Sequence, residues 1–219
     1  LAAARGIPLA VINGRISARA LGRYRLVAPW LRPIVSRVDL FLMQTQADAD
    51  RAIFLGARPE RVHVVGSLKW DASIGARPSA DLILDTAARA GVHNGEPVVV
   101  AGSTHRGEET MMLEALQVLR TSHPRARLIM APRHLERLEE VEALIRPSDL
   151  LSVRLSRVNP VDHWDVGLVD TMGELPRYYG MASVVFIGGS LIPHGGQNPL
   201  EATSLGKPVL FGPFMHNFA

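Results

Sequence analysis

The stretch SVVFIGGSLIPHGGQNPLEATSLGKPVLFG, residues 183–212, carries the pattern that decides the fold class. The apolar run 183–188 is typical of a buried strand, residues 198–205 suit a helix, and 207–212 suit a second strand. A strand, a helix and a strand in close succession indicate parallel strands. Four glycines lie within residues 188–196. Because glycine loses much backbone entropy on folding, this cluster needs a local reason, such as close approach of the backbone to a ligand.

The same alternation extends over the whole chain. We expect further strands at 7–13, 39–45, 61–67, 97–102, 126–132, 150–155 and 165–170. We expect further helices at 17–27, 46–56, 80–91, 107–120 and 135–146, and a short one from Gly173. Ser17 suits an N-cap, and Pro29 and Pro33 are expected to break up the segment after residue 27, since proline has no N–H to donate.

Residues 67–80 show no clear periodicity and contain Gly, Pro and Ser, so we expect a linker there. The predicted fold is α/β, with two Rossmann-like, doubly wound domains. Residues 1–66 would be the remainder of a first domain, and residues 81–219 a second one that is truncated at its end.

Length and composition limit the class of protein. The chain has 219 residues, of which 47% are apolar, enough for one large domain or two small ones. It has no cysteine, which excludes disulfides and suits a reducing compartment. No signal peptide and no run able to cross a bilayer is evident. The chain begins without Met and stops just after a loop, so we expect it to be part of a longer protein.

Charge is unevenly distributed along the chain. Residues 1–70 hold eleven Lys and Arg against four Asp and Glu, a net charge of +7, and the rest holds thirteen against seventeen, a net of −4. A basic first part suits an anionic partner, which could be a phospholipid surface, a phosphorylated lipid or nucleic acid. A solvated basic face without a specific partner fits the charge equally well.

Chemistry-bearing side chains collect in four loops of the second part, each after a predicted strand. The loops are GSTHRGEE (102–109), PRHLER (132–137), DTMGEL (170–175) and the glycine loop GGSLIPHGGQNPLEA (188–202). In an open parallel sheet the strand ends that precede these loops meet at the carboxyl edge, where ligands bind. The loops lead into helix N-termini, whose free N–H groups attract anions, so we expect a phosphate-bearing ligand.

Each loop offers groups suited to such a ligand. Ser103, Thr104 and His105 are hydrogen-bonding groups, and Arg106 adds charge. Arg133 and His134 suit a phosphate or carboxylate. Gly173 lets backbone amides approach a ligand. Asn198 is expected to cap a helix that has Pro199 at its first position, and Glu201 suits a ribose diol.

A structural role is also open for each group. The hydroxyls suit helix caps, Arg133 a surface ion pair, and Glu174 and Glu201 helix N-termini. His105, His134 and His194 lack metal-ligand spacing, so we propose no metal.

Seven motifs in order resemble one family. They are INGRIS, GSLKWD, AGSTHRGEE, APRHLER, DTMGELPRYY, GGSLIPHGGQNPLEA and GPFMHNF, and the chain is similar over nearly its whole length to 3-deoxy-D-manno-octulosonic acid (Kdo) transferases. The resemblance implies the GT-B fold, two Rossmann-like domains facing a cleft. It implies transfer of Kdo from CMP-Kdo to the lipid A precursor (lipid IVA), with inversion, in lipopolysaccharide biosynthesis at the cytoplasmic face of the bacterial inner membrane. We expect no cofactor and no nucleic-acid partner.

The resemblance also assigns roles to residues of the second part. It places Lys69 near the cleft, Ser103 and His105 near the donor sugar, and Arg133, with Pro132 beside it, at the donor's charged part. Met172, Gly173 and Glu174 would line the cytidine monophosphate, Asn198 would hold the phosphate and Glu201 the ribose. The substrate-binding glycine loop would contribute Gly188, Gly189, Ser190, Gly195, Gly196 and Gln197.

Two departures from the family pattern affect these expectations. Gln197 stands where the family usually has His, so a cationic role is lost there. The family's acidic general base lies in an early segment that this chain lacks. The chain also lacks the family's C-terminal segment, which packs on the first domain. We therefore assign no catalytic residue and expect at most partial donor binding without turnover. Two alternatives stay open: another GT-B enzyme, either a glycosyltransferase or an epimerase, that uses a UDP-sugar, and a non-catalytic nucleic-acid-binding module.

Overall fold

The computed structural model describes residues 5–68, 77–93, 95–161 and 163–218. The chain forms two compact units, Leu1–Ala72 and Ser73–Ala219. The division falls inside the range 67–80 that the sequence marks as a linker. Most of that range, together with Lys69, lies outside the described residues, so the linker stays a prediction.

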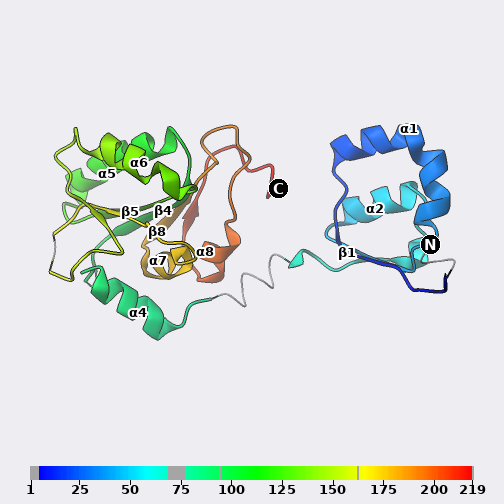
Figure 1. The fold of residues 1–219 in the computed structure, drawn as a ribbon, viewed down its shortest axis with the longest axis horizontal. Helices are drawn as coiled ribbons and strands as arrows, with labels where there is room; N and C mark the ends of the chain where they lie inside the picture. Colours follow the sequence, from blue (N-terminus) through cyan, green and yellow to red (C-terminus); the bar gives the residue numbers. More distant parts are fainter. Residues whose placement is uncertain (1–4, 69–76, 94, 162, 219) are drawn as a thin grey trace. The chain divides into compact units, whose positions relative to one another are not determined.

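The first unit is a small parallel sheet with helices on one side (Figure 1). Its strands β1 (Ala10–Gly14), β2 (Leu40–Met43) and β3 (Val62–Val64) pair in chain order, and all are parallel. Helices α1 (Ala18–Val35) and α2 (Gln46–Phe54) and the 3-10 turn η2 (Pro59–Arg61) connect them. The buried core is centred on Phe41 and Met43 of β2, packed against Ala49 and Ala52 of α2. The described residues supply one layer of helices, whereas parallel sheets ordinarily have two.

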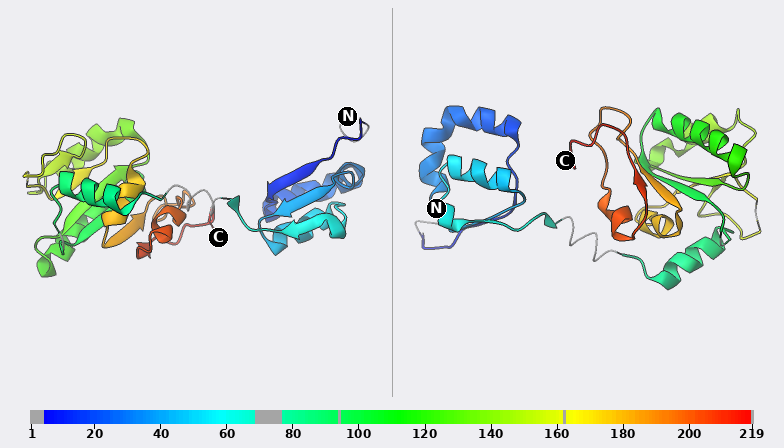
Figure 2. Two further views of the ribbon diagram at one scale, coloured as in Figure 1. Left: turned by 90° about the horizontal axis from the view of Figure 1, so that it is seen from below. Right: turned by 180° about the vertical axis from the view of Figure 1, so that it is seen from behind.

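Helix α1 corrects one expectation. It begins as predicted, with the Ser17 hydroxyl accepting a hydrogen bond from the Ala20 amide at 3.2 Å. However, Pro29 and Pro33 lie inside an 18-residue helix and do not end it. The helix bends instead, as both ribbon views show (Figures 1 and 2). Both prolines are exposed, so water can take up the carbonyl groups that lose their helical partners.

The second unit has a six-stranded parallel sheet in the order β6-β7-β5-β4-β8-β9. The strands are β4 (Val98–Thr104), β5 (Arg127–Pro132), β6 (Ser152–Arg154), β7 (Val166–Leu168), β8 (Val184–Ile187) and β9 (Val209–Leu210). The helices are α4 (Ala80–Arg89), α5 (Glu108–Ser122), the 3-10 turn η3 (Leu135–Arg137), α6 (Leu138–Ile145), α7 (Leu175–Met181) and α8 (Leu200–Ser204). Helices α5 and α6 cover one face of the sheet, and α4, α7 and α8 cover the other (Figure 1).

Alternation along the central strands explains the two layers. On β5, Leu128 and Met130 point into the core under α5 and α6, whereas Ile129 and Ala131 point into the core under α7 and α8. All four side chains are buried, so the strand is apolar on both faces, as a central parallel strand must be. The α/β, doubly wound prediction is therefore confirmed, with helix and strand ends differing by a few residues.

Strand order identifies a switch point. From β4 the chain proceeds to β5 on one side, and β8 then pairs with β4 on the other side. Connections on the two sides of β4 leave the sheet in opposite directions, which opens a crevice outside the carboxyl ends of β4 and β8. Among the described residues, no helix combines the length and apolarity needed to span a membrane.

Candidate functional site

The ends of β4 and β8 press together at the switch point. The Gly188 N–H donates to the Gly102 carbonyl at 2.8 Å, and a Cβ on Gly188 would lie 2.2 Å from the Ser103 carbonyl oxygen. Backbone atoms occupy the space that a side chain would need. The first glycine of the loop is therefore required by the packing of the two strand ends.

Ser103 has an unusual backbone conformation at this point. Its φ is +55°, in the left-handed region that side chains other than glycine seldom adopt, and the β4–β5 register shifts between Gly102 and Thr104. Beyond the shift, the Arg133 N–H donates to the Thr104 carbonyl at 2.9 Å. The loops after β4 and β5 are thus joined at their bases, and Ser103 is half-buried.

The first turn of the glycine loop binds an internal anion. The amides of Gly189, Ser190 and Leu191 donate to the Glu108 carboxylate at 2.7, 3.0 and 3.0 Å. The Ser190 hydroxyl donates to the Ile187 carbonyl and accepts the Gly212 N–H at 2.9 Å. In this structure the amides of Gly189 and Ser190 are therefore committed to the protein, and the assignment of these two residues to substrate binding stays a prediction.

The second half of the loop packs on the chain end. Gly195 and Gly196 have φ of +105° and +78°, and Cβ atoms there would lie 2.3 Å from the Asn217 side-chain nitrogen and 2.2 Å from the Met215 sulfur. The amides of Gly196 and Gln197 donate to the Gly189 and Gly188 carbonyls. These glycines shape a loop that folds back on itself.

Three histidines from three loops meet above this base. The His105 ring centroid lies 4.1 Å from that of His194 and 6.2 Å from that of His134. The Gln197 side-chain amide nitrogen is 3.2 Å from His105 Nε2, so it donates to an unprotonated ring nitrogen. Burial, followed by the charge of His194, lowers the pKa of His105 below its usual value. No group of acidic or histidine side chains with metal-holding geometry occurs within the described ranges.

Arg133 and Arg106 differ in their availability. Arg106 forms a bidentate pair with Glu140 at 2.9 and 2.7 Å. Hydrogen bonds from Arg106, and next from Arg137, lower the pKa of Glu140 to about 2. Arg133 is exposed, and its guanidinium has no hydrogen-bond or ion-pair partner among the residues that the structure describes. Arg133 is therefore the cation of the two that is free to bind a ligand. Pro132 beside it is buried at the end of β5, opposite Thr104 of β4.

The loop after β7 leaves its backbone open. Gly173 has φ +79°, a Cβ added to it would meet no atom within 4 Å, and Met172 is exposed. Glu174 is the N-cap residue of α7, where it accepts the Thr171 hydroxyl and pairs with Arg177 at 2.9 Å. Because β7 lies next to β5 and runs parallel to it, this loop shares the carboxyl edge with Arg133.

Asn198 and Glu201 lie at the start of α8. The Asn198 side-chain oxygen accepts the Leu200 N–H at 3.1 Å, but the N-cap residue is Pro199 and not Asn198, so the helix begins one residue later than expected. Burial raises the pKa of half-buried Glu201, and a hydrogen bond with Asn198 opposes the rise. Burial, followed by the charge of Glu201, raises the pKa of Tyr179 above its usual value.

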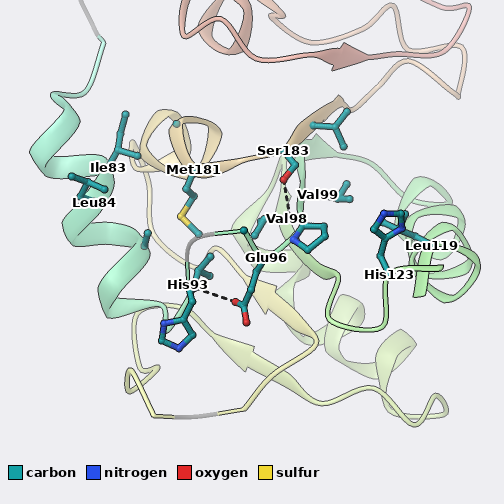
Figure 3. Close-up of a pocket in the computed structure, with 16 residues that line it drawn as sticks. Ile83, Leu84, His93, Glu96, Val98, Val99, Leu119, His123, Met181 and Ser183 are labelled. Atoms are coloured by element: carbon teal, nitrogen blue, oxygen red, sulfur yellow. Dashed lines mark hydrogen bonds between the residues drawn. The ribbon is translucent and has the colours of Figure 1, made fainter. Parts of the chain in front are cut away.

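A large cavity lies elsewhere, at the amino edge of the same sheet (Figure 3). It has a volume of about 620 Å³ between α4 and the starts of β4 and β8, and its lining is mostly apolar. Its polar groups have partners: the Glu96 carboxylate accepts the His93 N–H at 3.1 Å, and the Ser183 hydroxyl accepts the Val98 N–H at 3.2 Å. Ligands of open parallel sheets bind at the opposite edge, which favours the four loops as the candidate site.

Solved structures of similar fold define the class. The chain is similar to UDP-GlcNAc 2-epimerase from Methanocaldococcus jannaschii, at TM-score 0.58 and 14% identity, over 95% of this chain and 55% of that one. It is similar to the enzyme of that name from Neisseria meningitidis, at TM-score 0.57 and 18% identity, over 96% of this chain and 53% of that one. The fold is thus that of the GT-B type glycosyltransferases and epimerases.

Closer relatives identify the family. The model of the 3-deoxy-D-manno-octulosonic-acid transferase (kdotransferase) family matches residues 1–72. The Bordetella pertussis transferase of that name is 39% identical over 100% of this chain and 51% of that protein. The C-terminal CMP-Kdo binding domain of WaaA from Acinetobacter baumannii is 34% identical, at TM-score 0.56, over 64% of this chain and 75% of that one. The chain belongs to the Kdo transferase family, and it spans about half the length of the curated relatives it matches.

Proposed function

We propose that the protein to which this chain belongs transfers Kdo from CMP-Kdo to the lipid A precursor, with inversion, in lipopolysaccharide biosynthesis. The second unit would bind the donor at the carboxyl edge of its sheet. The observation that carries the proposal is Arg133, which directly precedes His134 of the histidine cluster and whose guanidinium has no partner among the described residues, in a chain of this family. The similarity of this chain to the C-terminal CMP-Kdo binding domain of the Acinetobacter protein supports it.

Within the site, the free groups suit the parts of a sugar nucleotide. Arg133 would pair with the phosphate, bidentately, and stabilise the charge that grows on CMP as it leaves. The open backbone at Gly173 would approach the nucleotide, and Glu201 would accept hydrogen bonds from ribose hydroxyls. His105 would face the sugar. Because Glu108 occupies the first amides of the glycine loop, the phosphate would be bound by Arg133, Asn198 and the loop after β7.

The donor assignment is tested by nucleotide binding to this chain. CMP should raise the melting temperature and UDP should not, because the family's donor carries cytidine monophosphate. Arg133→Ala should lose most of the CMP-induced shift. Arg125→Ala is the matched control, since Arg125 is also exposed but precedes β5 at the opposite edge. Stabilisation by UDP alone would support an epimerase or UDP-sugar transferase and reject the Kdo assignment.

We also propose that the first unit meets an anionic membrane surface, at the cytoplasmic face of the inner membrane. On α1, Leu26, Trp30 and Ile34 are spaced four apart on one row and are 86%, 81% and 65% exposed. The same helix carries four arginines and no acidic residue. An apolar row beside cations is typical of helices that lie in a membrane interface, where each arginine contributes about 1 kcal/mol.

Vesicle binding tests this surface. The chain should bind vesicles that contain anionic phospholipid more tightly than neutral ones, and Trp30→Ser should weaken that binding several-fold. Val118→Ser on α5 removes an apolar side chain of similar exposure, 71% against 81% for Trp30, from the second unit and should have no effect. Equal binding of the wild type to both vesicle types, or an equal loss in both variants, would reject the assignment of α1. Binding of single-stranded RNA in place of vesicles would favour the nucleic-acid alternative.

A further inference from the structure

Glu108 is a buried carboxylate with an unusual set of partners. It is fully buried in the first turn of α5. One of its oxygens accepts the His105 N–H at 2.9 Å and the Gly189 N–H at 2.7 Å. The other accepts the N–H groups of Ser190 and Leu191, each at 3.0 Å. Four backbone donors therefore converge on one side chain, from two loops that lie more than 80 residues apart in sequence.

This geometry resembles a phosphate site filled by the protein itself. Successive backbone N–H groups in a tight turn form a concave anion-binding nest. Here the anion is a side-chain carboxylate that is held from within the fold. Four hydrogen bonds and the positive end of α5 offset the loss of water around the buried charge. The loop that the sequence marks for a ligand therefore takes its shape from Glu108.

The position of the histidine cluster depends on this arrangement. His105 belongs to the β4 loop, whereas His194 and Gln197 belong to the β8 loop, and the contacts among them cross between the loops. Glu108 joins the two loops through their backbone amides, at His105 itself and at Gly189. We propose that Glu108 is a positioning residue of the donor site, which locks the β8 loop on the β4 loop so that His105 and Gln197 face the sugar nucleotide. This inference rests on the proposed donor-binding function.

The neighbouring Glu109 provides a matched control. It is also fully buried in the first turn of α5, but its carboxylate pairs with Arg137 at 2.8 Å, on the side of α6. It makes no hydrogen bond to the β8 loop among the described residues. The two acids thus share residue type, burial and helix position, and differ in whether they hold the loop.

The experiment compares Glu108→Gln with Glu109→Gln in this chain. A glutamine at position 108 replaces one accepting oxygen with an NH₂ group that would face two amide donors. We expect Glu108→Gln to weaken CMP binding about tenfold or more, given the usual strength of hydrogen bonds to a charged group. Glu109→Gln should leave CMP binding within about twofold, whatever it does to the melting temperature.

Chemical rescue separates positioning from general stability. In Glu108→Ala, added formate would supply two oxygens to the vacated amides, and CMP binding should recover with formate concentration. The amide ¹⁵N signals of Gly189, Ser190 and Leu191 should shift in the variant and return with formate. Formate should not rescue Glu109→Ala. Should Glu108→Ala not fold, Glu108→Asp is used, which withdraws the carboxylate by one methylene and should weaken CMP binding and shift the same three amides.

These experiments test the role of Glu108 separately from the proposed binding of CMP-Kdo. If Glu108→Gln and Glu109→Gln affect CMP binding equally, or if formate leaves the three amide signals unchanged, Glu108 has no special positioning role. If the wild-type chain does not bind CMP, the proposed function fails. In that case the formate-dependent amide shifts still decide whether Glu108 orders the loop.

Discussion

Substituting Gly188 with alanine tests how closely the site depends on contact between two strand ends. The added Cβ would lie 2.2 Å from the Ser103 oxygen, 2.5 Å from its carbonyl carbon and 2.7 Å from the Thr104 Cα. Carbon–oxygen contacts normally stay beyond about 3.3 Å. Since all three neighbours are backbone atoms, β4 and β8 must separate by about 1 Å at their carboxyl ends.

Two contributions set the magnitude. Overpacking against a rigid neighbour costs about 1–3 kcal/mol. The hydrogen bond from Gly188 to Gly102, now 2.8 Å long, would also be lost, at about 1 kcal/mol. We therefore expect Gly188→Ala to lower the free energy of unfolding of the second unit by about 2–4 kcal/mol, and its melting temperature by roughly 6–12 °C. CMP binding should also weaken, because the glycine loop moves with the strand end.

The assay is urea unfolding together with CMP titration, and Gly206→Ala is the control. Gly206 has φ +70° with open space around it, so alanine there meets strain but no clash. We expect Gly206→Ala to lower stability by about 1 kcal/mol and to leave CMP binding unchanged. If Gly188→Ala is no more destabilising than the control and binds CMP normally, the strand ends do not constrain the site as argued.

Three further predictions concern titration and the core. The folded-state pKa of His105 lies below its usual value, so acidification below about pH 6.5 should destabilise the fold. The NMR titration midpoint of His105 should rise in His194→Asn, because the charge of His194 lowers the pKa of His105. An unchanged midpoint would reject this charge coupling. Glu140 has a folded pKa of about 2 against 4.5, so the stability it provides is present above pH 4.5 and lost as pH falls toward 2. In Glu140→Gln, the free energy of unfolding measured in urea should depend less steeply on pH between 2 and 4.5. The same pH dependence in the variant and the wild type would contradict this. Trp164→Phe should lower the free energy of unfolding in urea by about 2 kcal/mol, because the buried Trp164 indole N–H donates to the Ala90 carbonyl at 2.8 Å. A loss below about 0.5 kcal/mol would show that this hydrogen bond contributes little.

Much of the fold could be predicted because its signals are local. The apolar runs of the central strands and the Ser17 cap are set by residues near in sequence, and the structure confirms them. The effect of Pro29 and Pro33 is harder to predict, because a proline in the helix interior either ends the helix or bends it. Here the helix continues, with Ala28 buried beneath its exposed prolines.

The site was only partly predictable for a different reason. The position of Arg133 after a strand indicates a ligand cation, and the structure leaves that guanidinium free of partners among the described residues. The residue pattern does not single out Glu108, since its partners Gly189 and Ser190 are distant in sequence. Whether a loop amide faces a ligand or an internal carboxylate depends on tertiary contacts, and residue type alone does not determine it.

Amide chemical-shift mapping of the ¹⁵N-labelled chain with CMP would show which edge of the second unit's sheet binds the nucleotide. We expect the largest shifts at Arg133, Gly173 and Asn198, on the carboxyl edge. Shifts concentrated instead around Ser183 and His93, which line the cavity at the amino edge, would contradict it.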